Sequence, residues 1–79
     1  MTPFVIGGRE EVAGFALAGV HGSVCTTREE VEAAMRDDAL LIFSANTAAL
    51  VRDRLDAWER GGRGPLFVVL RSAGGRDLP

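Results

Sequence analysis

The chain has 79 residues, of which 47% are hydrophobic and 25% are charged, and its formal net charge at pH 7 is −2. A chain of this length forms at most one domain and buries only about 60% of the surface that it exposes when unfolded. Arginines and acids alternate along the chain, which argues against nucleic-acid binding because phosphate neutralisation needs a clustered excess of cations. All nine strongly basic residues are arginines, so chemistry that needs a lysine nucleophile or a phosphate-loop lysine is excluded.

Cysteine usage and the N-terminus bear on the cellular compartment. Cys25 is the single cysteine, so it cannot close an intrachain disulfide, and no Cys/His cluster is present for zinc. The first residues carry no basic leader, and no apolar run approaches the ~18 residues of a membrane span. We expect a cytoplasmic protein that is neither exported nor membrane-spanning and that holds no metal.

The first predicted elements are a strand followed by a helix. Residues 4–6 form a β-branched and aromatic run that stops at two glycines, which is typical of a short buried strand. Residues 9–20 then carry apolar side chains at helical spacing. Glu10 and Glu11 fall in the first turn of this helix, where the helix dipole favours acids.

The middle of the chain repeats this order. A very short strand is predicted around residues 23–25. Thr27 and Glu30 have the spacing of a capping box, in which each side chain satisfies a backbone amide of the first helical turn. Residues 39–43 form the most hydrophobic segment, which is apolar on both faces and therefore typical of a central parallel strand.

The last predicted elements are a third helix and a fourth strand. Asn46 can cap a helix over residues 46–60, whose apolar side chains repeat every three and four residues. Pro65 precedes an apolar strand at residues 66–70. Residues 71–79 show no apolar periodicity, so we expect one domain over residues 1–70 and a flexible tail over residues 71–79.

The β-α-β-α-β-α-β pattern predicts an α/β fold. Continuous apolar strands joined by helices imply a parallel sheet with helices on both faces and right-handed crossovers. We predict a small flavodoxin-like (Rossmann-like) three-layer sandwich with a four-stranded sheet in the order 2-1-3-4 and three helices. The second and fourth strands would be edges, which makes weak self-association plausible.

Ligands of such folds bind at the carboxyl ends of the strands. The turn at Gly7, Gly8 and Arg9 runs from a strand into a helix N-terminus and could cradle a phosphate, with Ser44 as a second contact. The full glycine fingerprint is absent, however, and two carboxylates follow directly, so a plain tight turn is favoured.

Two further chemistries are disfavoured by the residues at the strand ends. A receiver-type phosphoacceptor could use Glu10 and Glu11 as its acidic cluster, but it needs a carboxylate after the third strand, and Ser44 stands there. His21 could form a catalytic dyad with Ser23 or Cys25, although a solvated histidine beside a buried cysteine is the favoured interpretation. We therefore predict no catalytic residue and no cofactor site.

The third helix offers candidate partner contacts. Trp58 lies on its apolar arc, Leu50 extends that arc, and Arg54 falls inside the widened arc. One interpretation is that the arginine lies along the core and the tryptophan covers it. The other is an aromatic and arginine pair at a protein interface, where these residue types concentrate. We predict Leu50, Arg54, Trp58 and Arg71 as partner-binding residues.

Four ordered segments resemble the F subunit of the V-type (archaeal-type) ATP synthases: residues 5–20, 26–35, 40–58 and 65–70. The match runs in order over about residues 4–70, and most of its specificity lies in GFALAG at residues 14–19. Family members continue beyond the fourth strand into a C-terminal segment that is often helical, whereas this chain continues with RSAGGRDLP. The resemblance is therefore to a member with a shortened C-terminus.

The resemblance implies a non-catalytic component of the central stalk. Such a component binds the shaft protein, which is the D subunit, and other parts of a rotary ATPase that couples ion transport to ATP synthesis or hydrolysis. It implies a cytoplasmic location, peripheral to the membrane through the complex alone. Gly14 and Gly19 are then interpreted as letting the first helix lie close to the sheet or to a neighbouring chain. The alternative is a stand-alone flavodoxin-like ligand or phosphate-binding domain.

Overall fold

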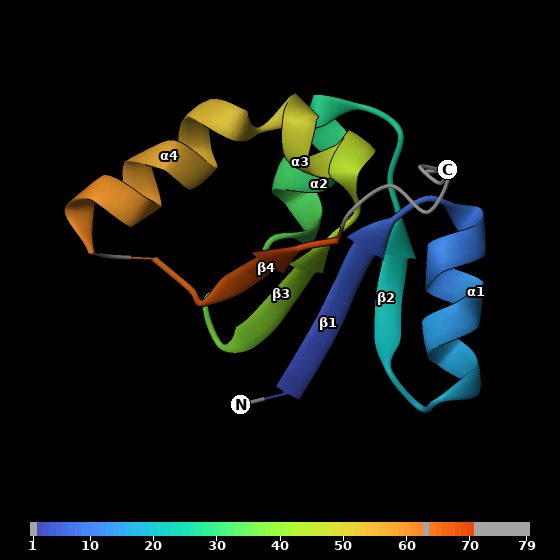
Figure 1. The fold of residues 1–79 in the computed structure, drawn as a ribbon. Coiled ribbons are helices and arrows are strands. Elements are labelled where there is room, and N and C mark those ends of the chain that lie inside the picture. Colours follow the sequence, from blue (N-terminus) through green and yellow to red (C-terminus); the bar gives the residue numbers. More distant parts are fainter. Residues whose placement is uncertain (1, 63, 71–79) are drawn as a thin grey trace, which may run out of the picture.

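The computed structural model describes residues 2–62 and 64–70, which form a four-stranded sheet with helices on both faces (Figure 1). All strand pairs are parallel and the spatial order is β2-β1-β3-β4, as predicted. The strands are β1 (Thr2–Gly7), β2 (His21–Val24), β3 (Ala39–Phe43) and β4 (Phe67–Val69). The short second strand thus begins two residues earlier than expected and ends before Cys25.

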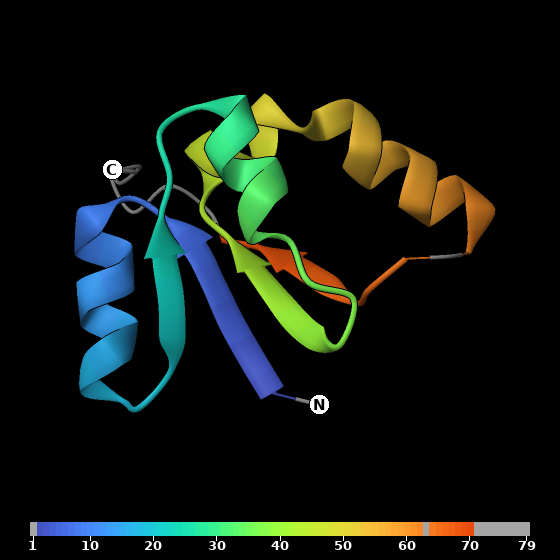
Figure 2. The same ribbon diagram turned by 180° about the vertical axis from the view of Figure 1, so that it is seen from behind.

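The helices fall into two groups. Helix α1 (Arg9–Leu17) packs against β1 and β2, while the other three lie together on the opposite face of the sheet, as Figures 1 and 2 show from the two sides. These three are α2 (Arg28–Ala34), α3 (Ala45–Leu50) and α4 (Arg52–Gly61). The layers confirm the predicted sandwich, but the described residues form four helices where three were expected.

The predicted third helix over residues 46–60 is interrupted at Val51. This residue has φ −127° and ψ 30°, it is fully buried, and it separates α3 from α4. The interruption lets α3 lie beside β1 and β3 while α4 turns away, yet Ala48 and Leu55 both remain in the core. The predicted cap is also wrong, since the Ser44 side chain, rather than that of Asn46, accepts the hydrogen bond from the Thr47 amide.

The core lies between the sheet and the helices α2, α3 and α4. Ile6, Leu41 and Phe43 point to this side, which we call the core face, and all three are fully buried. Alternation along the strands turns Val5 and Ile42 to the opposite side, the α1 face. Burying large apolar side chains on the core face stabilises the fold by about 1.5–3 kcal/mol each.

Helix α1 buries less of its apolar surface than its sequence suggested. None of its residues is fully buried, and Leu17 keeps 93% of its surface exposed. Gly19 has φ +87° just beyond the helix, a conformation that favours glycine. A Cβ atom at Gly14 would meet nothing within 4 Å, so the expectation that Gly14 brings α1 close to the sheet is wrong. Its approach to a neighbouring chain remains a prediction.

Candidate functional site

The carboxyl edge of the sheet is where this class of fold places its ligands. A cavity of about 230 Å³ lies there, between the ends of β1, β2 and β3. Its lining is mixed in polarity and includes Gly8 and Ser44 of the possible phosphate site, but neither Gly7 nor Arg9. The residues are Gly8, Glu11, Cys25, Thr26, Ser44, Asn46, Thr47 and Leu50.

Three backbone amides at this edge are occupied by the chain's own carboxylates. Glu11 accepts a hydrogen bond from the Gly8 amide at 3.0 Å. Glu30 accepts from the Thr26 and Thr27 amides at 2.8 and 3.3 Å, which confirms the predicted capping box. The hydrogen bonds from Thr26 hold the pKa of Glu30 below its ordinary value. An anion would have to displace these carboxylates and would meet their negative charge.

Ser44 and Thr47 are engaged in the fold. The Ser44 hydroxyl accepts from the Thr47 amide at 3.2 Å and lies 3.0 Å from the Thr47 hydroxyl. The Thr47 hydroxyl donates to the Ile6 carbonyl at 2.7 Å, which ties α3 to the end of β1. Both side chains are buried. They therefore start α3 and anchor it, and the geometry gives no support to the phosphate-binding alternative.

The possible catalytic dyad is not assembled. His21 and Cys25 are four residues apart on an extended segment, so their backbones are separated by roughly 13 Å. Within residues 2–62 and 64–70, no hydrogen bond joins His21 to Ser23 or Cys25. The Cys25 thiol is buried and donates to the Glu30 carbonyl at 3.5 Å. Burial, and then the nearby Glu30, raise the pKa of this thiol, which disfavours the reactive thiolate.

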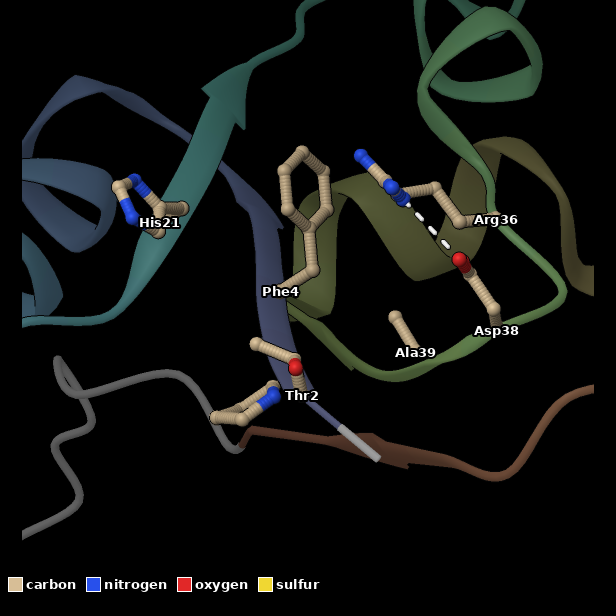
Figure 3. A pocket seen from close by; sticks show the side chains of 7 residues that line it. Thr2, Phe4, His21, Arg36, Asp38 and Ala39 are labelled. Carbon is tan, nitrogen blue, oxygen red and sulfur yellow. Dashed lines mark hydrogen bonds and ion pairs between the residues drawn. The ribbon is translucent and has the colours of Figure 1, made fainter.

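A second cavity of about 230 Å³ lies at the opposite, amino end of the strands (Figure 3). The Arg36 guanidinium there lies 5.5 Å from the centre of the Phe4 ring and 3.4 Å from the Asp38 carboxylate. His21 faces the same space from β2. The arginine thus already contacts an aromatic ring and an acid of its own chain.

The described residues contain neither a metal centre nor a membrane span. No group of three or more His, Cys, Asp or Glu side chains in residues 2–62 and 64–70 is placed to hold a metal ion. Over the same residues, every helix is too short or too polar to cross a membrane.

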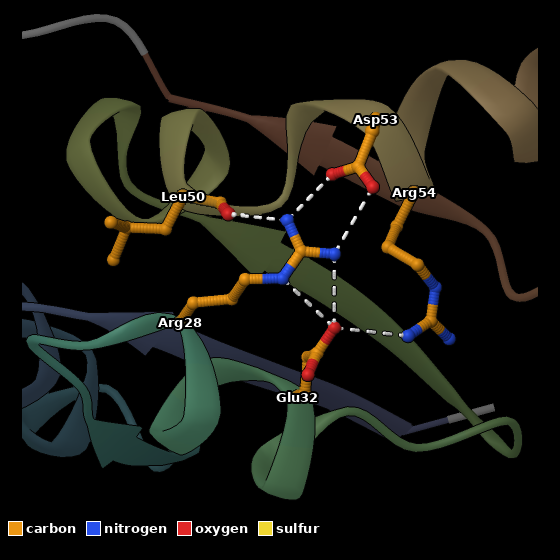
Figure 4. A network of polar contacts seen from close by, with 5 residues as sticks. All are labelled: Arg28, Glu32, Leu50, Asp53 and Arg54. Atoms are coloured by element: carbon orange, nitrogen blue, oxygen red, sulfur yellow. Dashed lines mark hydrogen bonds and ion pairs between the residues drawn. The ribbon is translucent and has the colours of Figure 1, made fainter.

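The most extensive polar network lies on the outer side of α2, α3 and α4 and centres on Arg28 (Figure 4). Its guanidinium donates to both carboxylate oxygens of Asp53, at 2.8 and 3.1 Å, and to Glu32 at 3.1 Å. It also donates to the Leu50 carbonyl at 3.2 Å, one of the acceptors that the end of α3 leaves without a helical partner. The pKa of Asp53 is lowered, chiefly by the hydrogen bonds from Arg28.

Three of the four predicted partner-binding residues lie in or next to this network. Arg54 pairs with Glu32 at 3.3 Å and lies 5.7 Å from the centre of the Trp58 ring, so the predicted arginine and aromatic residues do meet. Leu50 contributes its carbonyl and is half-buried. The fourth residue, Arg71, lies outside the described residues.

Trp58 serves the core as well as the surface. It is half-buried, and its ring centre lies 6.0 Å from that of Phe67 on β4. Gly64 lies so close that a Cβ atom there would be 2.6 Å from the Trp58 ring. Trp58 thus joins α4 to the start of β4, which supports the interpretation that it covers the core. Its exposed part remains accessible beside Arg54.

Sequence reasoning missed Arg28, Glu32 and Asp53. The spacing of Arg28 and Glu32 within one helix was a usable signal, because side chains four residues apart are neighbours on a helix surface. Asp53 could not be placed, because its approach to Arg28 depends on the interruption at Val51. A continuous helix would have directed that carboxylate elsewhere.

The fold and the strand ends together define a small flavodoxin-like α/β domain in which Glu11 and Glu30 occupy backbone amides at the carboxyl edge of the sheet. The family model of the ATP synthase (F/14-kDa) subunit matches residues 4–77. The chain therefore belongs to that family and is a subunit of a multi-subunit ATP synthase of the V type. No curated protein matched the chain in a search by sequence.

Proposed function

We propose that the chain is a non-catalytic component of the central stalk, which binds the shaft protein (the D subunit of the complex) and helps to transmit torque during coupled ion transport. Family membership over residues 4–77 is the observation that carries this proposal. The self-capped strand ends support it, since the usual ligand edge of the fold is occupied by Glu11 and Glu30. In this role the chain is cytoplasmic and reaches the membrane only through the complex.

We further propose that Leu50, Arg54, Trp58 and Arg71 contact a partner in the complex. Arginine and tryptophan concentrate at interface hot spots. Arg54 is exposed, and it lies beside an acid, Glu32, that a partner's basic side chain could share. The charged network around Arg28 then affects the orientation of the bound partner more than the affinity of the complex.

Co-purification with the shaft protein tests the proposed function against its alternative. The full chain carrying an affinity tag is co-expressed with the shaft protein of the same ATP synthase, and the complex is measured by size-exclusion chromatography with light scattering. A stable complex of the two supports the proposal. Tight binding of phosphate or a nucleotide by the isolated chain, with no complex with the shaft, would instead support a stand-alone ligand-binding domain.

A further inference from the structure

The edge of the sheet at β4 is apolar and lacks the features that normally protect an edge strand. Leu66, Val68 and Val69 keep 63%, 47% and 39% of their surfaces exposed. Edge strands are usually protected by charged side chains or by proline, yet residues 66–70 (LFVVL) contain neither. Within residues 2–62 and 64–70, β4 pairs with β3 alone and ends the sheet (Figure 1).

The backbone of β4 presents hydrogen-bonding groups at this edge. The Leu66 carbonyl accepts from β3 at 3.0 Å, and the Leu70 amide donates to β3 at 2.8 Å. In a parallel pair, alternate residues direct their amide and carbonyl toward the neighbouring strand. The amides and carbonyls of Phe67 and Val69 are therefore directed away from β3, where a further strand can pair with them.

We propose that a second copy of the chain supplies this strand, so that two β4 strands pair antiparallel around a twofold axis at Val68. The pairing joins the two sheets into one continuous sheet. A twofold contact of this kind uses the same surface on both chains and closes the assembly at a dimer. The inference makes the predicted self-association specific to one edge, and it does not depend on the proposed function.

The sequence of β4 and its flanks is complementary to itself in this register. Phe67 lies opposite Val69 of the second copy, and each such pair exchanges both backbone hydrogen bonds. On the α1 face, Val68 lies opposite Val68 of the second copy in a non-hydrogen-bonded pair, where side chains are closest. Leu66 lies opposite Leu70. Each exposed apolar side chain of this edge thus meets another apolar side chain.

The other edge of the sheet is less suited to this pairing. Strand β2 reads HGSV, so Val24 is its single large apolar side chain. A twofold pair of β2 strands would bring polar side chains and a glycine together. Its backbone also presents groups outward, since the Cys25 amide donates to β1 at 2.9 Å and the Val24 amide is therefore directed away. Side-chain composition, more than the backbone, favours β4.

Sedimentation equilibrium of the full chain, from about 10 µM to about 1 mM, tests the proposal. A reversible dimer with a dissociation constant of about 100 µM is expected, because pairing through one short strand makes a small interface. A chain that stays monomeric throughout this range would overturn the inference.

Two proline variants assign the edge. Val69→Pro and Val24→Pro each remove an outward-directed amide from an edge strand, a position where proline is tolerated. Val69→Pro is expected to raise the dissociation constant at least about tenfold, whereas Val24→Pro leaves it within about twofold. Circular dichroism checks that both remain folded. A dimer that only Val24→Pro dissociates would use the β2 edge and would overturn the inference.

Charged variants at Val68 test the twofold axis without altering the backbone. Like charges directly opposite each other destabilise a strand pair, so Val68→Lys and Val68→Glu are each expected to remain monomeric where wild type is half dimeric. An equimolar mixture of the two is expected to dimerise, because a lysine then faces a glutamate. If each variant alone dimerises as wild type does, Val68 does not lie opposite itself and the inference is overturned. None of these results bears on binding to the shaft protein, which the co-purification experiment measures separately.

Discussion

The Arg28 guanidinium binds both carboxylate oxygens of Asp53 and so joins the start of α2 to the start of α4, across 25 positions of sequence. Bidentate pairing of this kind is geometrically specific. The same guanidinium also donates to the Leu50 carbonyl, so one side chain closes the interruption between α3 and α4.

Replacing Arg28 by lysine is expected to lower the melting temperature by a few degrees. Lysine keeps the charge but cannot donate in parallel to both oxygens of Asp53 while also reaching Leu50. Differential scanning fluorimetry measures the change. Arg36→Lys is the control, since the Arg36 ion pair is a single 3.4 Å contact with the neighbouring Asp38. Equal melting temperatures for the two variants would show that the bidentate geometry contributes nothing to stability.

Gly14→Ala is expected to stabilise the isolated chain by about 1 kcal/mol, because alanine favours a helix and the added methyl group meets no atom within 4 Å. Gly19→Ala is expected to destabilise it by roughly 1 kcal/mol, because Gly19 has φ +87°. Urea denaturation measures both. A loss of stability for Gly14→Ala would mean that this glycine has an internal packing role after all.

Thr47→Val is expected to lower the free energy of unfolding by about 1 kcal/mol. The substitution keeps the shape but removes the hydroxyl that donates to the Ile6 carbonyl at 2.7 Å. Thr47→Ser keeps that hydroxyl and loses a methyl group, so comparing the two variants in urea separates the hydrogen bond from packing. The prediction is contradicted if valine is tolerated better than serine.

The dependence of the chain's stability on pH in the acidic range is expected to involve Glu30. Its pKa is lowered in the folded chain by the hydrogen bonds from Thr26. A carboxylate with a lowered folded-state pKa stabilises the fold above its unfolded-state pKa, about 4.3 for glutamate, and this contribution is lost as the pH falls through the folded-state value. Glu30→Gln should therefore be less stable than wild type at pH 7, with the two melting curves converging below about pH 4.

Glu29→Gln is the control for this titration. The neighbouring Glu29 is exposed, and its carboxylate accepts no hydrogen bond within residues 2–62 and 64–70. At pH 7 this substitution should lower the melting temperature less than Glu30→Gln does, because it removes no capping hydrogen bond. If Glu30→Gln follows wild type, the capping contacts are not what stabilises the start of α2.

Arg54→Glu combined with Trp58→Ala is expected to weaken incorporation into the assembled stalk while the monomer stays folded. Arg54→Glu removes the pair with Glu32 and reverses the charge of the exposed surface. Circular dichroism and pull-down of the complex measure folding and binding separately. Because Trp58 contacts Phe67, unfolding of the double variant but not of Arg54→Glu would assign Trp58 to the core alone.

The sheet was predictable because its strands are marked by composition and its order by the alternation of strands and helices. The third strand was predicted with the correct bounds at residues 39–43, since a short run that is apolar on both faces is typical of a strand buried inside a parallel sheet. The capping box at Thr27 and Glu30 was also predicted correctly, because it depends on local spacing alone.

The features that sequence could not place depend on tertiary structure. Val51 carries no local signal of a helix end, and the interruption between α3 and α4 coincides with its burial in the core. The sequence alone does not show whether Gly14 faces the sheet or the solvent, so its predicted close packing with the sheet was wrong. Contact of Leu50, Arg54, Trp58 and Arg71 with a partner stays a prediction, as does self-association through the edge strands.

The glutamates that cap α1 and α2 have a consequence for work inside the complex. A component of an ATP synthase operates in a solution rich in ATP, ADP and inorganic phosphate, and an uncapped helix start would attract such anions. With Glu11 and Glu30 already seated at those amides, the melting temperature of this chain should be indifferent to added nucleotide. Nucleotides and phosphate would then leave the starts of α1 and α2 unchanged.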